Sequence, residues 1–219
     1  LDVTQRRRAE EQVQHMACHD SLSGLPNRAL LEEHLRSRLA RASREGSRVA
    51  VLFLDIDGVL NGLETREPPS PIHKGLFLNP ALVERVNTIV ERTGAVVVLT
   101  TSWRTRRHVV GAPDAHLSLD ELREALRLAG ARFAVLDKTP DLAREDSIGR
   151  DEVAVKLWRC PPRRKEIAAW VEQHRPDAYA ILDDDPEAGI DGHFVHVDRR
   201  RGASAQDVER AVQILGGAS

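Results

Sequence analysis

A run of apolar residues that ends in two closely spaced aspartates constrains this chain more than any other feature. Residues 48–54 read Arg-Val-Ala-Val-Leu-Phe-Leu, and Asp55, Asp57 and Gly58 follow at once. Such a continuous apolar run is typical of a strand buried on both faces of a parallel sheet. The strand would carry both carboxylates to its carboxyl end, where open α/β sheets place their chemistry.

Two carboxylates two residues apart allow two interpretations. With Mg²⁺ bound, the first carboxylate can attack phosphorus while the second transfers protons. Alternatively, the pair belongs to a loop that caps the next helix or turns in solvent. The rest of the chain favours the first interpretation, because it supplies further polar strand ends in order.

Two more apolar runs end in polar side chains. Residues 94–99 close on two threonine hydroxyls at 100–101, and residues 178–182 close on three aspartates at 183–185. Between these runs, residues 163–174 read as a helix with basic residues in its first turn. Three predicted strands therefore end in groups that can bind a phosphate or a metal ion.

The alternation of strand-like and helix-like segments predicts an α/β fold, with a parallel sheet and helices on both faces. Asn79 and Gly94 are expected to bound one helix, and Ser118 and Gly130 another. The polar segment 137–160 has no clear pattern. Helices are predicted at 3–19, 26–44, 80–92, 119–129, 163–174 and 204–215, and strands at 48–54, 95–99, 134–136, 178–182 and 194–197.

Over about residues 48–216 the chain resembles the haloacid dehalogenase-like (HAD) superfamily, which has four motifs in a fixed order. The matching features are, in order, the aspartate pair, the two hydroxyls, the basic helix start and the acidic triplet. Within this superfamily, the chain is most similar to the HAD domain of Swiss Army Knife RNA repair proteins. That domain favours an Asp-x-Asp-Gly-Val-Leu-Asn opening and a hydroxyl-hydroxyl-Trp-Arg second motif. The resemblance implies a Rossmann-like three-layer α/β/α core.

HAD enzymes often enclose small substrates under a cap domain, inserted after the first motif or between the second and third. Here residues 62–93 hold a loop and one helix that the core itself needs, and only residues 137–160 remain unassigned. No large cap domain fits in these gaps. An open site favours a phosphate on a large substrate, such as a nucleic-acid end or a phosphoprotein, although small phosphatases without caps exist.

By resemblance, Asp55 is the nucleophile that becomes an aspartyl phosphate, and Asp57 is the general acid and base. The same resemblance places Mg²⁺ between Asp55, the backbone carbonyl of Asp57 and Asp184, with Asp183 beside them. Adjacent carboxylates repel one another, and a bound cation relieves the repulsion. The competing interpretation of the acidic triplet is a solvated loop.

The hydroxyl that binds the phosphoryl oxygens is predicted to be Thr100, with Thr101 as the alternative because the strand end is uncertain by one residue. Either threonine could instead cap the next helix. For the cationic third motif, Arg163 fits the spacing of the RNA-repair-like proteins, and Lys165 fits the superfamily preference for lysine. Both side chains could also be simply solvated.

A basic run follows the second strand and could line the mouth of the site, where it would bind a polyanionic substrate. Such a run is more often the solvated face of a helix. It consists of Arg104, Arg106, Arg107 and His108. His193 and His196 show no metal-ligand spacing and are expected to be structural or exposed.

The first 47 residues differ in character. Residues 2–12 and 19–28 resemble the linker helix and the opening of a GGDEF diguanylate cyclase domain, and the likeness continues to Asp57. It then stops, because no Gly-Gly-Asp/Glu-Glu-Phe signature occurs. We therefore expect a helical, GGDEF-like segment over 1–47 and a HAD-like domain over 48–219, with at most a weak dimer through the N-terminal helix. Natural fusion and construction are both open explanations of the junction.

Composition narrows the classes of function that remain open. A net charge of -2 gives no global attraction to nucleic acid or membranes, and 4% aromatic residues argue against a base-stacking platform. Cys18 and Cys160 lack metal-ligand spacing and are expected to be reduced thiols. No apolar stretch approaches the ~18 residues of a membrane span, so a cytoplasmic protein is expected. Because the chain begins with Leu1, we expect a fragment of something longer.

These observations predict a Mg²⁺-dependent HAD-type phosphohydrolase. Its first rival is a catalytically idle HAD fold that serves as a binding or signalling module, which would not need Asp55, Asp57 and Asp184 together. The second rival, a cyclase-like signalling protein, lacks its signature. The substrate is not fixed by the sequence.

Overall fold

The structure is a computed structural model, and the chain divides into two compact units, Leu1–Arg48 and Val49–Ser219. The predicted helices at 3–19 and 26–44 lie outside the described residues, as do both cysteines. No helix among the described residues is long and apolar enough to cross a membrane. The described residues are 48–65, 69–104, 117–142, 144–148, 155–159 and 162–216.

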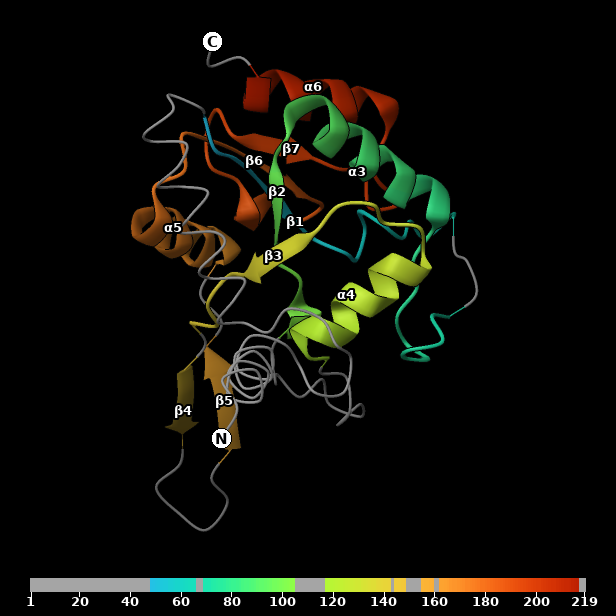
Figure 1. The fold of residues 1–219 in the computed structure, drawn as a ribbon. Helices are drawn as coiled ribbons and strands as arrows, with labels where there is room; N and C mark the ends of the chain where they lie inside the picture. The colour runs from blue at the N-terminus through green and yellow to red at the C-terminus, as the bar shows by residue number, and fades with distance from the viewer. Residues whose placement is uncertain are drawn as a thin grey trace, which may run out of the picture. The chain divides into compact units, whose positions relative to one another are not determined.

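A five-stranded, all-parallel sheet forms the centre of the second unit, in the order β3-β2-β1-β6-β7 (Figure 1). The central strand β1 is buried along its whole length, which explains its continuous apolar sequence. The predicted parallel sheet is thus confirmed. Its strands are β1 (Ala50–Leu54), β2 (Val96–Leu99), β3 (Val135–Lys138), β6 (Ala178–Asp183) and β7 (Phe194–His196).

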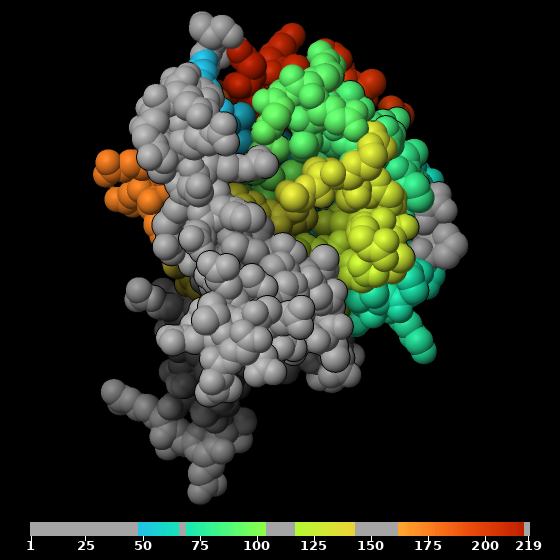
Figure 2. All heavy atoms as spheres, viewed as in Figure 1, coloured from blue at the N-terminus to red at the C-terminus, as the bar shows by residue number. Residues whose placement is uncertain are grey.

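Helices cover both faces of this sheet. Leu52 and Leu54 of β1 belong to the core cluster that includes buried residues of α3 (Pro80–Thr93), α4 (Leu119–Leu128) and α6 (Ala205–Gly216). Phe53 points the other way and meets Trp170 of α5 (Arg163–His174) edge to face, at 5.4 Å between ring centroids. In Figure 2 the green atoms of α3 lie directly against the red atoms of α6. The three-layer α/β/α core is therefore confirmed.

The helix boundaries follow the predicted capping residues. The Asn79 side chain accepts a hydrogen bond from the backbone of Ala81 at the start of α3, and Gly94 ends that helix at φ 66°. Ser118 forms a reciprocal capping box with Glu121 at the start of α4. These local signals fix where α3 and α4 begin.

The segment that had no clear sequence pattern contains an antiparallel hairpin. Its strands are β4 (Arg144–Ile148) and β5 (Val155–Arg159), and it lies in the chain between β3 and α5. Both strands carry charged residues that hide the alternation on which strand prediction depends. The hairpin lies in the chain where a cap could be inserted, but its two five-residue strands are too small for a large cap domain, and none is present among the described residues.

Candidate active site

The carboxyl ends of three neighbouring strands meet at one point. Leu54, the last residue of β1, pairs with the residues of β2 and β6 that directly precede Thr100 and Asp183. The register continues beyond the strands, because the Asp55 amide donates to the Leu182 carbonyl at 3.1 Å and the Thr100 amide to the Leu54 carbonyl at 2.9 Å. Asp55, Thr100 and Asp183 are all buried. Pairing of the sheet thus brings two carboxylates and a hydroxyl together.

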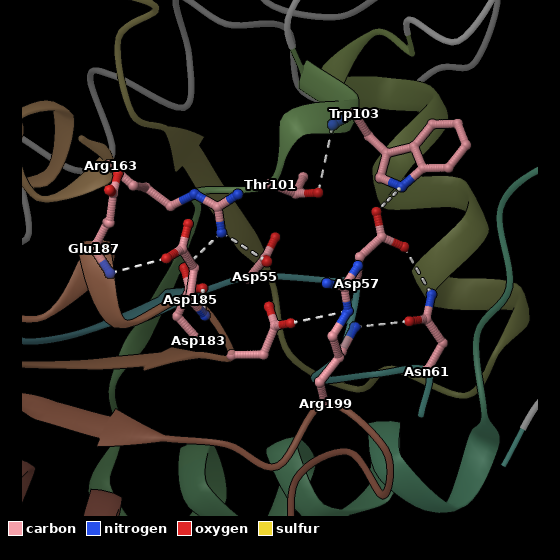
Figure 3. A network of polar contacts seen from close by, with 12 residues as sticks. Asp55, Asp57, Asn61, Thr101, Trp103, Arg163, Asp183, Asp185, Glu187 and Arg199 are labelled. Carbon is pink, nitrogen blue, oxygen red and sulfur yellow. Dashed lines mark hydrogen bonds and ion pairs between the residues drawn. The ribbon is translucent and has the colours of Figure 1, made fainter. Parts of the chain in front are cut away.

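Arg163, the first residue of α5, brings a positive charge to this point. Its Nη1 donates to Asp55 Oδ2 and to Asp183 Oδ2, both at 2.7 Å (Figure 3). Burial of the guanidinium works against its charge, but the two carboxylates raise the pKa of Arg163 above its ordinary value. Lys165, the alternative cation, is exposed on the same helix. Of the two candidates, the structure places Arg163 against the carboxylates.

The two buried aspartates carry more negative charge than one arginine neutralises. Burial raises the pKa of Asp55 above its ordinary value, and it outweighs the opposite effect of Arg163. Burial and the nearby Asp55 together raise the pKa of Asp183 to about 7. One further positive charge, either a proton or a cation, would therefore be stabilised between these side chains.

Asp184 completes a carboxylate cluster with these two aspartates. Each of Asp55, Asp183 and Asp184 offers an oxygen, and the three oxygens lie within 4.8 Å of one another. Burial, followed by the charge of Asp55, raises the pKa of Asp184. Gly58 makes this approach possible: it adopts φ 78°, and a Cβ there would lie 2.5 Å from Asp184 Cγ.

The cluster fits a divalent cation with oxygen ligands. Oδ1 of Asp55 is buried and has no hydrogen-bond partner among the described residues. Buried polar atoms are normally paired, so an unpaired carboxylate oxygen beside two other acids suits a metal ligand or an attacking nucleophile. Carboxylate and carbonyl oxygens are the ligands that Mg²⁺ prefers.

The Asp57 side chain lies apart from this cluster. Its Oδ1 accepts from Asn61 Nδ2 at 2.9 Å, and its Oδ2 accepts from the indole Nε1 of Trp103 at 2.8 Å. Both donors belong to the motifs that carried the family resemblance, although sequence reasoning gave them no role. Their positions four residues after the aspartate and within the hydroxyl-Trp-Arg motif were the only signal.

The two threonines and the basic run are the remaining predicted site residues. Thr100 Oγ1 is buried without a hydrogen-bond partner in the described part of the chain, and Thr101 Oγ1 accepts from the Trp103 amide at 3.4 Å. Arg104 ends the 3₁₀ turn η1 (Ser102–Arg104), but its side chain is outside the described residues, as is all of 105–116. The mouth-lining role of this basic run stays a prediction.

The two singled-out histidines contact backbone carbonyls. The Nδ1 atom of His193 lies 2.9 Å from the carbonyl of Tyr179, whose ring stacks on the imidazole at 3.8 Å between centroids. The Nε2 atom of His196 lies 3.1 Å from the carbonyl of Asp184. Neither belongs to the carboxylate cluster. The structure therefore gives both histidines supporting contacts around β6.

A second basic feature, absent from the sequence-based predictions, borders the site. Arg199, Arg200 and Arg201 follow β7, with side chains 71%, 72% and 78% exposed. Arg199 Nε lies 3.5 Å from Asp184 Oδ2. The carbonyls of Arg199 and Arg200 accept from the amides of Leu63 and Glu64, which anchors this arginine loop to the segment after Asp57. Three consecutive arginines were the available sequence signal.

Comparison with known proteins agrees with this geometry. The family described as "HAD domain in Swiss Army Knife RNA repair proteins" matches residues 51–208. The diguanylate cyclase GGDEF domain matches residues 17–59. The two matches overlap at β1 and the aspartate pair, so both families share this strand, as the sequence suggested. No solved structure matches the chain.

The curated relatives share only short regions with this chain. Protein y4lL of Sinorhizobium fredii, which is uncharacterized, is 46% identical over 65 residues. The bifunctional diguanylate cyclase/cyclic di-GMP phosphodiesterase MucR of Pseudomonas aeruginosa is 44% identical over 56 residues, and the diguanylate cyclase TpbB of the same species is 44% identical over 59. Each match covers 26% of this chain, and 8%, 8% and 14% of these relatives respectively.

The cyclase likeness is thus confined to a small N-terminal part, whereas the HAD match spans the parallel sheet and every aspartate of the site. Because that match covers most of the sequence, it settles the classification. The chain belongs to the family of HAD domains found in Swiss Army Knife RNA repair proteins.

Proposed function

We propose that this protein is a Mg²⁺-dependent phosphomonoesterase that works through an aspartyl phosphate on Asp55. The observation that carries this proposal is the buried Asp55 carboxylate, which has one oxygen paired with Arg163 and the other without a partner in the described residues. Membership of a HAD family supports a phosphoesterase in general. The nucleophile, the metal and the substrate are our inference.

The reaction proceeds in two displacements at phosphorus. An oxygen of Asp55 attacks phosphorus, the bond to the leaving-group oxygen breaks, and Asp57 gives that oxygen a proton. Asp57, now ionised, takes a proton from water as the water oxygen attacks phosphorus. The bond between phosphorus and Asp55 then breaks, which releases inorganic phosphate and regenerates the carboxylate.

Positive charge around the phosphoryl group lowers the barrier to both displacements. We expect Arg163 to neutralise the phosphoryl oxygens and the hydroxyl of Thr100 or Thr101 to donate a hydrogen bond to them. Asp55, Asp184 and the backbone carbonyl of Asp57 would hold Mg²⁺, with Asp183 beside them. When bound, the ion supplies further charge neutralisation at the transferring group.

The substrate we propose is a phosphate at the end of a nucleic acid. The described part of the chain contains no large cap domain that would limit the site to small molecules. In the arginine loop (Arg199, Arg200 and Arg201), Arg199 lies 3.5 Å from Asp184 of the cluster. The exposed guanidinium groups of Arg200 and Arg201 follow it in the chain, and a phosphodiester next to the scissile phosphate would meet this positive charge. The family description, which names RNA repair proteins, points the same way.

A catalytically idle binding module is the alternative. Such a module would gain nothing from burying Asp55 and Asp183 against a single arginine, because burial of like charges costs stability. The site therefore favours catalysis over passive binding. The cyclase-like alternative has only the short match over residues 17–59.

A comparison of substrates tests the proposal. We expect Mg²⁺-dependent release of phosphate from 3′- or 5′-phosphorylated oligonucleotides, with higher kcat/KM than from p-nitrophenyl phosphate. The charge reversal Arg200→Glu should raise KM for the oligonucleotide and leave the small ester unaffected, because it opposes only the remote phosphates. Arg210→Glu, an exposed residue of α6, is the matched control. No hydrolysis of any phosphomonoester would refute the phosphatase, and equal effects on both substrates would refute the nucleic-acid end.

A further inference from the structure

We infer that Trp103 and Asn61 are positioning residues that hold the proton-transferring carboxylate of Asp57 in its working orientation. The inference rests on the proposed function and adds two residues to it. Both oxygens of Asp57 are anchored, Oδ1 by Asn61 Nδ2 at 2.9 Å and Oδ2 by Trp103 Nε1 at 2.8 Å (Figure 3). Two donors, one on each oxygen, define the rotation of a carboxylate about its terminal bond.

Asn61 is itself held in place, so its contact with Asp57 is not a loose surface pairing. Its Oδ1 accepts from the Gly58 amide at 2.8 Å, and its Nδ2 also donates to the carbonyl of Phe77 at 2.9 Å. The Gly58 amide donates to the Asn61 carbonyl as well, at 3.0 Å. The turn after β1 is thereby closed, and the asparagine NH₂ is directed at Asp57.

Trp103 reaches Asp57 from η1, the 3₁₀ turn that follows β2, 46 residues away in sequence. Its backbone carbonyl accepts from the Leu117 amide at 3.0 Å, and His73 lies edge to face on its ring at 5.2 Å between centroids. A Cβ at Gly75 would lie 3.2 Å from the indole ring, which shows how closely this loop covers the tryptophan. The indole N–H therefore has a defined direction.

This arrangement suits a group that must exchange protons with a substrate. Each anchoring bond uses one lone pair of a carboxylate oxygen, so each oxygen keeps an acceptor site. Asp57 does not join the carboxylate cluster that fits Mg²⁺, and it stays available for the leaving-group oxygen. A general acid must lie within hydrogen-bond reach of that oxygen, and small displacements cost much of the rate.

The test removes the indole N–H while keeping an aromatic ring. Trp103→Phe should lower kcat for p-nitrophenyl phosphate about tenfold, a fraction of the 10²–10⁴ that general acid–base catalysis supplies, with little change in KM. Trp170→Phe is the matched control. Its Nε1 also donates to a carboxylate, Asp137 Oδ2 at 2.9 Å, but that bond lies outside the site. The control should keep kcat within about twofold of wild type.

A double-mutant cycle separates positioning from general damage. In an Asp57→Asn background, Trp103→Phe should cause no further loss of kcat, because the group that it positions is already disabled. An equal loss in both backgrounds would overturn the inference, as would full activity of the single variant. If Asp57→Asn is itself as active as wild type, the assigned role of Asp57 fails instead, so the two failures are distinguishable.

A spectroscopic readout covers variants that turn over too slowly to measure. The indole N–H resonance of Trp103, assigned from its loss in Trp103→Phe, should shift in Asp57→Ala, while that of Trp170 should not. An unchanged Trp103 resonance would mean that the hydrogen bond is not formed in solution, and the inference would be wrong.

Discussion

Arg163 Nη1 donates a 2.7 Å hydrogen bond to Asp55 Oδ2, across 108 residues of sequence. The same nitrogen donates to Asp183 at the same distance. One nitrogen atom at the start of α5 thus links the ends of β1 and β6. The sheet positions the two carboxylates, and the first residue of the helix positions the guanidinium between them.

Because one Arg163 nitrogen contacts both acids, we predict that alanine and lysine at position 163 have different effects on activity. Arg163→Ala leaves two buried carboxylates facing each other and should lower kcat/KM by about 100-fold, the loss typical for removal of a charge-stabilising donor. Arg163→Lys should recover much of this activity, because a single ammonium can contact both acids. Lys165→Ala should have little effect on steady-state kinetics. If instead Lys165→Ala were the damaging change, the third-motif cation would have to be reassigned.

Asp55→Asn should abolish turnover of a phosphomonoester in the presence of Mg²⁺, because an amide has nearly the same shape but is a poor nucleophile. The fold should persist, since Asp55 sits at the end of a fully buried strand whose pairing uses backbone groups. Circular dichroism together with phosphate release measures both properties. Full activity of a well-folded variant would refute the covalent mechanism.

Two neighbouring aspartates should respond differently to truncation. Asp184→Ala should raise the Mg²⁺ concentration needed for half-maximal activity, because Asp184 belongs to the carboxylate cluster. Asp185 instead caps the 3₁₀ turn η2 (Pro186–Ala188) by accepting from the Glu187 amide at 2.9 Å. Asp185→Ala should cost about 1 kcal/mol of stability and leave the Mg²⁺ requirement unchanged. Equal shifts in that requirement would mean that the metal ligand has been misassigned.

The raised pKa of Asp183, about 7 in the folded protein because of burial and then Asp55, predicts how stability varies with pH. An aspartate in an unfolded chain titrates near 3.9, so between these values the folded state holds the extra proton. Stability should therefore fall as pH rises from about 4 to about 7, by at most about 1.4 kcal/mol per pH unit for one proton. It should then level off.

Urea unfolding in EDTA at pH 5, 6, 7 and 8 measures this dependence. Asp183→Asn cannot lose the proton, so its stability should fall less over the same range, while the other titrating groups are common to both proteins. A fall as steep in Asp183→Asn as in wild type would place the titration on a different residue.

Much of the fold could be read from the sequence because its signals are local. The apolar run before Asp55 is buried on both faces, and Asn79, Gly94 and Ser118 end or begin helices through their own side chains and backbone. The β4–β5 hairpin escaped prediction, since its charged strands lack an apolar face that alternates. Sheet order follows from long-range pairing, which no local pattern specifies.

The site residues likewise fall into those that local sequence signals predict and those that depend on tertiary packing. Residues at strand ends, such as Asp55 and Asp183, could be predicted because parallel strands gather their carboxyl ends at one edge. The choice between Arg163 and Lys165 depended on which face of α5 meets the sheet, which is a tertiary property. Trp103 had no predicted role, because its hydrogen bond to Asp57 joins loops that are far apart in the chain.

We predict that the GGDEF-like segment over residues 1–47 can be separated from the HAD domain over residues 48–219. The sheet begins at Ala50, and every residue assigned to the site lies beyond it. Deleting residues 1–46 should therefore leave a soluble protein whose kcat and Mg²⁺ requirement match those of the full chain. The matched control is the full chain with Asp55→Asn, which should be folded and inactive.

Gel filtration of the full chain and of this truncation checks the associated expectation about assembly. The predicted N-terminal helix is too short for three or four heptads, so the full chain should dimerise weakly at most, and the truncation not at all. Aggregation of the truncated protein, or loss of activity in a folded one, would mean that the N-terminal residues support the phosphatase core. The boundary would then have to be placed before residue 47.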